Sequence, residues 1–147
     1  MVAVDTGYYE SQRRGIDTTY AAQMATNTFS RTLAQSRGNR NLSFMTQGFK
    51  RNTPHFTSSF AQRGLGGAGV QSGVMQHAMQ NYLGDYTTQY GQAQNDLTDQ
   101  LRQYDLNAAQ LGANRTGAYA DLELQKARDV AFAAQNIEAL RASLGGL

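Results

Sequence analysis

The chain has 147 residues and a formal net charge of +2, which fits one domain or one extended subunit. Leu, Ile, Val and Phe together make up 26 of the 147 residues, about 18%, which is low for a self-sufficient globular core. The chain has no cysteine, which excludes a disulfide framework and a thiolate metal site. We therefore expect a chain that depends on assembly for much of its apolar burial.

The first part of the chain, residues 1–69, is predicted to contain an arm, short helices and a glycine-rich turn. Residues 1–15 have no usable period and are expected to form an extended arm. Asp17 is a plausible cap for a helix over residues 18–36, and Arg37-Gly38 is typical of a helix end. The polar, irregular residues 39–52 are expected to form a loop.

A second short helix is predicted from Thr53-Pro54, because a cap residue followed by proline favours a helix start. This helix is expected to stop at a left-handed Gly64, with Phe60 against Leu65. Gly64–Gly69 matches G-x-G-x-x-G, but a dinucleotide site needs a preceding strand, and none is visible. The glycines therefore predict a tight turn and no cofactor.

The stretch from Val70 to Leu111 organises the second part of the chain, residues 70–147. Its apolar residues recur in steps of 4, 3 and 4, an eleven-residue repeat that predicts a nearly straight helix. A break is expected near residues 112–117. We expect this stripe to pack against other copies or a partner, because the rest of the chain is too short to cover it.

The last segment continues as a helix with a different period. Val130, Ala133, Ile137, Leu140 and Leu144 follow steps of 3, 4, 3 and 4, a seven-residue seam that favours a left-handed coiled coil. The predicted fold is all-α: an elongated long-helix subunit with short N-terminal helices and an extended arm, which assembles into a helical bundle or ring. The expected subunit interface comprises Met75, Met79, Tyr82, Tyr86, Tyr90, Leu97, Leu101, Tyr104, Ile137 and Leu140.

Positive charge is concentrated in the first half of the chain, where no acid occurs from Thr18 to Gly84. The candidate contacts to nucleic acid or to an acidic partner are Arg37, Arg40, Lys50 and Arg51. The alternative is a solvated or subunit-facing charge asymmetry, since the cations are sparse for a dedicated nucleic-acid binder. Phe44 and Phe49 either stack on nucleobases or anchor the predicted loop by packing.

The sequence offers no convergent catalytic or metal site. His55 and His77 lie in different predicted helices, whereas a metal site needs three or four ligands. Asp96, Asp99 and Asp105 have the spacing of a helix face and not that of a calcium loop. We expect no enzyme activity, no metal and no cofactor, and no apolar run approaches the roughly 18 residues of a membrane span.

The stretch Phe60-Ala-Gln-Arg-Gly-Leu-Gly-Gly-Ala-Gly-Val70, followed by a helix rich in Gln, Ala and Tyr, resembles small helical virion proteins of tailed bacteriophages. The resemblance covers roughly residues 54–110. It implies a multi-copy virion part, made soluble in the host cytoplasm, which we expect in the tail, neck or tail tip. Its expected partners are further copies and portal, neck or tail proteins, with no membrane in the assembled state.

The same pattern is also similar to internal ejection proteins of short-tailed phages. Those proteins have a Gly-Ser-Gly step before a Gln-rich helix, where this chain has Ala68-Gly69. This alternative implies an internal protein associated with the portal and with DNA passage, and DNA is then a partner.

Overall fold

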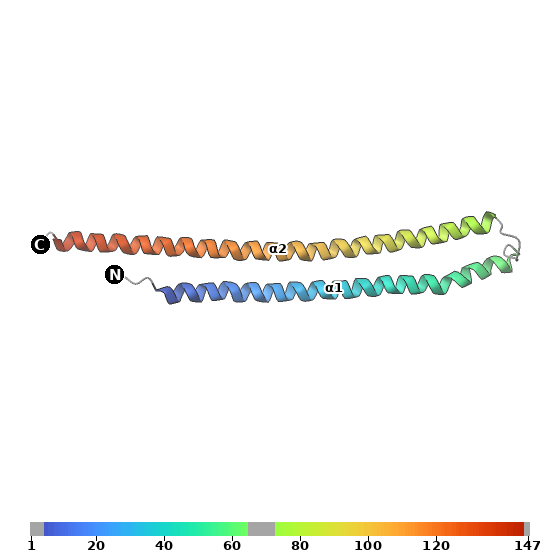
Figure 1. The fold of residues 1–147 in the computed structure, drawn as a ribbon, viewed down its shortest axis with the longest axis horizontal. Helices are drawn as coiled ribbons and strands as arrows, with labels where there is room; N and C mark the ends of the chain where they lie inside the picture. The colour runs from blue at the N-terminus through green and yellow to red at the C-terminus, as the bar shows by residue number, and fades with distance from the viewer. Residues whose placement is uncertain (1–4, 65–72, 146–147) are drawn as a thin grey trace. The chain divides into compact units, whose positions relative to one another are not determined.

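The computed structural model describes residues 5–64 and 73–145. These residues form two α-helices, α1 (Thr6–Gln62) and α2 (Gly73–Gly145), and no strand occurs among them (Figure 1). The predicted all-α class is therefore confirmed. The Asp5 carboxylate begins α1 by accepting a hydrogen bond from the backbone N–H of Gly7 at 3.0 Å.

The chain divides into two compact units, and each unit contains a segment of both helices. Unit 1 comprises Met1–Thr28 and Asp105–Leu147, and unit 2 comprises Phe29–Tyr104. Each unit is held together by contacts between its α1 segment and its α2 segment. The expected division of the chain between residues 69 and 70 stays a prediction.

Within unit 1 the α1 and α2 segments run antiparallel (Figure 1). The Lys126 ammonium lies 6.0 Å from the ring centre of Tyr9, and the Arg115 guanidinium lies 4.8 Å from that of Tyr20. Tyr9 and Tyr20 are eleven residues apart, and so are Arg115 and Lys126. Moving eleven residues forward along α1 therefore corresponds to moving eleven residues backward along α2.

Unit 2 shows the same matched spacing. Gly38 lies against Leu97, and Phe49 stacks on Tyr86 with ring centres 4.1 Å apart. Both pairs are separated by eleven residues on each helix, so α1 carries the same repeat as α2. An eleven-residue repeat keeps the contact face nearly straight along a helix, which lets two long helices remain in contact without strong supercoiling.

The first part of the chain differs from the prediction. The expected arm over residues 1–15, the helix end at Gly38, the loop over 39–52 and the helix start at Pro54 are wrong, because α1 is continuous from Thr6 to Gln62. Residues 1–4 lie outside the described residues.

Threonine and proline are accommodated inside this helix. Thr53 and Thr57 donate their hydroxyl hydrogens to the backbone carbonyls of Phe49 and Thr53, at 2.7 and 3.1 Å. Pro54 lies inside α1, where a proline costs about 3 kcal/mol relative to alanine. The packing of neighbouring aromatic side chains such as Phe56 against α2 offsets this cost.

The break expected near residues 112–117 is also absent, since α2 is continuous through Gly112 and Gly117. A glycine costs a helix about 1 kcal/mol relative to alanine. Arg115 lies between these glycines and forms an ion pair with Asp17 of α1 at 2.6 Å. Packing against α1 therefore holds this part of α2 in place.

The predicted end at Gly64 is confirmed for the described residues. Gly64 has a φ of 77°, the left-handed conformation that glycine adopts readily, and its N–H donates to the Ala61 carbonyl at 3.1 Å. The predicted contact of Phe60 with Leu65, and the glycine turn beyond Gly64, lie outside the described residues.

Burial is thin throughout the described residues. The buried apolar side chains among them are Tyr9, Ala34, Phe60 and Leu122, and no large side chain is fully buried. Two paired helices cover only one side of each other, so most of each helix surface stays exposed. Within the described ranges, no helix combines the length and the apolar character that a membrane crossing requires.

Candidate functional site

The stripe predicted to form a subunit interface faces α1 of the same chain in unit 2. From Met75 to Tyr104, every member of this stripe is half-buried. A Cβ on Gly38 would lie 2.4 Å from Leu97 Cδ1, so the backbone of α1 approaches this stripe very closely. The expectation that the chain is too short to cover the stripe is wrong, because α1 is one long helix.

Aromatic rings form the centre of this intramolecular contact. Phe49 stacks on Tyr82 and Tyr86, with ring centres 5.1 and 4.1 Å apart, and Phe56 stacks on Tyr82 at 4.5 Å. The Tyr86 hydroxyl lies 3.1 Å from the Thr46 hydroxyl, which gives this tyrosine the polar partner that burial requires. Phe49 is therefore a packing anchor and is not free to stack on a nucleobase.

The other predicted interface residues of unit 2 belong to the same face. Tyr90 lies beside Tyr86, with ring centres 5.8 Å apart. The other half-buried residues of the predicted interface in unit 2 are Met75, Met79, Tyr90, Leu97, Leu101 and Tyr104.

Ile137 and Leu140 occupy a different environment in unit 1. Near the start of α1, Tyr9 donates a hydrogen bond to Asp129, and α2 then continues from Val130 to Gly145 (Figure 1). In this segment Ile137 is half-buried and Leu140 is 60% exposed. These two predicted interface residues therefore lie beyond the last hydrogen bond between α1 and α2 among the described residues.

A polar cluster in unit 1 was not predicted from the sequence. Arg115 donates two hydrogen bonds to Asp17, at 3.0 Å from Nε and 2.6 Å from Nη2, and Tyr119 donates a third. The hydrogen bonds from Tyr119 and Arg115 lower the pKa of Asp17 below its usual value. Asp17 thus joins α1 to α2. The helix-capping role that the sequence suggested for Asp17 is wrong.

Two further polar pairs cross unit 1. The Asn107 amide donates a hydrogen bond to Asn27 Oδ1 at 2.7 Å, and Asn27 is buried. The hydrogen bond that Tyr9 donates to Asp129 raises the pKa of Tyr9 to about 12. Such part-buried polar pairs are satisfied only in one alignment, so they favour one register of the two helix segments in unit 1.

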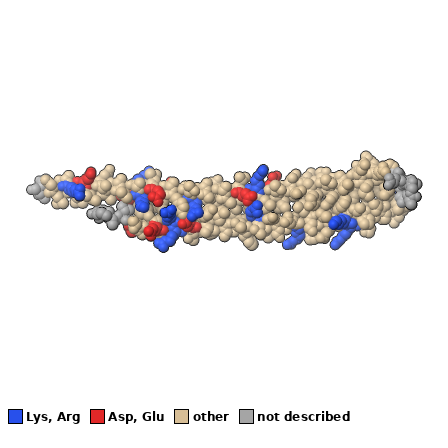
Figure 2. All heavy atoms as spheres, viewed as in Figure 1, with Lys and Arg blue, Asp and Glu red and all other residues tan. Residues whose placement is uncertain are grey.

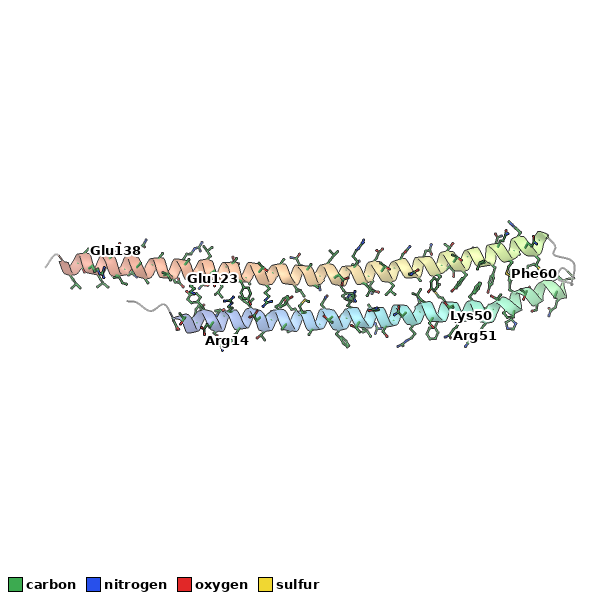
Figure 3. All side chains as sticks on the ribbon, in the orientation of Figure 1. Arg14, Lys50, Arg51, Phe60, Glu123 and Glu138 are labelled. Carbon is green, nitrogen blue, oxygen red and sulfur yellow. The ribbon has the colours of Figure 1, made fainter. Side chains whose placement is uncertain are left out.

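The predicted cationic residues Arg37, Arg40, Lys50 and Arg51 are all exposed on α1 of unit 2. Arg51 points away from α2, and the cations at this part of α1 have no acidic neighbours on the visible face (Figures 2 and 3). Phe29, Arg40 and Arg51 are eleven residues apart and so follow one line of the helix. Phe29 and Phe44 are 70% and 62% exposed beside these cations.

The described residues contain no group of three or more His, Cys, Asp or Glu side chains that could hold a metal ion. His55 and His77 are both exposed, on different helices. Open grooves follow the helix contact in each unit, for example beside Phe49 and Tyr86 in unit 2. Comparison with protein-family models, with curated proteins and with solved structures finds no match to this chain.

Proposed function

We propose that this chain is a non-enzymatic structural component of a tailed-phage virion, which oligomerises in the tail, neck or tail tip. The resemblance of residues 54–110 to small helical virion proteins supports the phage context. The observation that carries the assembly role is the exposure of large apolar side chains on both helices. Phe29, Leu106 and Leu144 are 70%, 65% and 67% exposed.

Exposed apolar side chains that occur singly are normal on protein surfaces, but among the described residues four large ones lie on α1 and eight lie on α2. Fully burying one large apolar side chain contributes about 1.5–3 kcal/mol, so assembly offers stabilisation that the helix pair alone lacks. The exposed large apolar side chains are Tyr8, Phe29, Leu33, Phe44, Val74, Leu83, Leu106, Leu124, Val130, Phe132, Leu140 and Leu144.

The virion role is tested on purified particles of the phage that encodes this chain. Quantitative mass spectrometry should find the protein in several copies per particle. Antibody labelling in electron micrographs should place it at the tail, neck or tail tip. Purified, infectious particles that lack the protein would contradict the proposal.

A second candidate function is an internal ejection protein associated with the portal and DNA passage. The line of Phe29, Arg40 and Arg51, with Phe44 beside it, favours this candidate, because cations interleaved with exposed aromatic rings bind single-stranded nucleic acid. This candidate predicts DNA binding that weakens steeply as salt rises.

The cations of α1 are tested by a fourfold substitution to glutamine at Arg37, Arg40, Lys50 and Arg51. The matched control removes four exposed cations elsewhere, namely Arg14, Arg102, Arg128 and Arg141. If α1 binds DNA, the first variant loses affinity and has a smaller salt dependence than the control variant. Equal DNA affinity of the two variants would remove this candidate.

A further inference from the structure

Unit 1 and unit 2 differ in how the chain connects their helix segments. In unit 2, α1 and α2 follow one another along the chain, with only residues 63–72 between them. In unit 1, one segment ends at Thr28 and the other begins at Asp105, so the whole of unit 2 lies between them in sequence. Because closing a longer loop costs more conformational entropy, unit 1 opens more readily than unit 2 when their contacts are equally strong.

The described contacts between the helix segments of unit 1 centre on polar and charged side chains. Asp17 accepts hydrogen bonds from Arg115 and Tyr119 across the pair, and Asn27 accepts one from Asn107. A partly exposed ion pair is weakened by salt, and it is lost when its acid is protonated. The pairing of unit 1 therefore depends on the solution.

The described contacts of unit 2 are mainly aromatic and apolar. Phe49 stacks on Tyr82 and Tyr86, and Leu97 lies against the α1 backbone at Gly38. Ring stacking and apolar burial do not require an ionised acid. Acid therefore weakens the contacts of unit 1 and leaves these contacts of unit 2 in place.

The charges around Asp17 determine what its protonation does to unit 1. Its carboxylate faces Arg13 from α1 and faces Arg115 and Tyr119 from α2, and these groups lower the pKa of Asp17. The Arg13 and Arg115 guanidinium groups lie 5.1 and 5.3 Å from the centre of the Tyr119 ring. Once Asp17 is neutral, no carboxylate offsets the repulsion between these two cations on opposite helices.

We propose that unit 1 is an acid-sensitive clamp, in which protonation of Asp17 lets the α1 and α2 segments separate while unit 2 stays paired. Separation exposes inner side chains that the pairing covers, among them Tyr9, Ile16 and Leu122. A helix segment without a packing partner is only marginally stable, so its backbone amides exchange faster with solvent. This opening is a property of the single chain and does not rest on the proposed function.

Hydrogen exchange followed by mass spectrometry tests the clamp at neutral pH. In the natural chain, amides of unit 1 should be less protected than those of unit 2. Asp17→Asn should speed exchange in unit 1 by about 3- to 10-fold and leave unit 2 unchanged, because it weakens one charged hydrogen-bond cluster. Glu10→Gln is the matched control, since Glu10 is an exposed acid of the same α1 segment without a described contact to α2.

Two results of this exchange experiment would overturn the clamp. One is equal protection of both units in the natural chain, which would show that the helix pair opens as a whole. The other is an Asp17→Asn variant that exchanges like the Glu10→Gln variant, or that speeds exchange equally in both units.

Spin-label distances test the opening directly, because the natural chain has no cysteine. Labels at Glu10→Cys and Gln125→Cys report on unit 1, and labels at Lys50→Cys and Asp85→Cys report on unit 2; all four positions are exposed. Acid should lengthen and broaden the unit 1 distance and leave the unit 2 distance unchanged. With Asp17→Asn, the longer unit 1 distance should already be populated at neutral pH. An unchanged unit 1 distance in acid, or equal lengthening in both units, would overturn the clamp.

Discussion

Gly38 lies so close to Leu97 that a Cβ at position 38 would sit 2.4 Å from Leu97 Cδ1 and 2.9 Å from Leu97 Cγ. This contact explains why a glycine is placed in the middle of α1, where alanine would favour the helix. The close approach lets the Leu97 side chain lie directly on the α1 backbone in unit 2.

The substitution Gly38→Ala should therefore destabilise the protein. Overpacking costs about 1–3 kcal/mol, which outweighs the helix gain of about 0.5–1 kcal/mol. Gly48→Ala is the matched control, since a Cβ there would meet nothing within 4 Å. Urea unfolding, monitored by circular dichroism, should give Gly38→Ala a lower free energy of unfolding than the natural chain. It should give Gly48→Ala a higher one. A stabilised Gly38→Ala variant would contradict the close approach.

Phe44 and Phe49 are predicted to differ sharply when truncated, although both are α1 phenylalanines in unit 2. Phe49→Ala should cost about 2 kcal/mol of unfolding free energy, because it removes two ring stacks and leaves a gap at the helix contact. Phe44→Ala should stay within about 0.5 kcal/mol, because Phe44 is exposed. If chemical denaturation shows that both variants lose the same unfolding free energy, the inner and outer faces of α1 are wrongly assigned.

The Tyr9 hydroxyl should titrate above the ordinary tyrosine range. Its hydrogen bond to the Asp129 carboxylate raises the pKa of Tyr9 to about 12. This contribution to stability is fully present below the ordinary tyrosine pKa and is lost as the pH rises through about 12. The ultraviolet absorbance of the natural chain minus that of Tyr9→Phe should report this late titration.

Asp129→Ala provides the control for this titration, since it removes the acceptor of the hydrogen bond. In chains that carry Asp129→Ala, the absorbance change of Tyr9 should have its titration midpoint at a lower pH. An unchanged titration midpoint would show that Asp129 does not hold the Tyr9 proton.

The ion pair of Asp17 with Arg115 predicts a loss of stability in acid. Hydrogen bonds from Tyr119 and Arg115 lower the pKa of Asp17 in the folded chain. The resulting stabilisation is present above the ordinary aspartate pKa and is lost as the pH falls through the lowered folded value. The stability difference between the natural chain and Asp17→Asn should therefore be larger at neutral pH than in strong acid, as measured by urea unfolding. A difference that is independent of pH would contradict this contact.

The helical stripe of α2 could be predicted from the sequence because its inner positions are occupied by Met, Tyr, Leu and Ala at regular spacing. The helix end at Gly64 could also be predicted, since glycine alone adopts its φ readily. The matching repeat of α1 was missed because Asn27, Gly38 and Thr53 occupy its inner face. A hydrophobicity pattern cannot show an inner position that is filled by a hydrogen-bonded amide or by bare backbone.

The residues of the candidate site were also only partly predictable from the sequence. The exposure of the α1 cations follows from their type, but the pairing of Asp17 with Arg115 depends on a register that a single sequence does not reveal. Thr53-Pro54 carried a strong helix-start signal, yet the ring stacks of Phe49 and Phe56 extend the helix through it. Local signals were overridden where side chains of α1 contact the second helix.

We propose that this chain is an assembly subunit whose helices pair within one chain and whose remaining apolar surface is buried by other copies. Sedimentation velocity of the natural chain across the micromolar range, with circular dichroism of the same samples, tests it most directly. We predict a helical species whose mass is a multiple of the 16.1 kDa chain and grows with concentration. A fully helical species that stays at 16.1 kDa at every concentration would contradict the account.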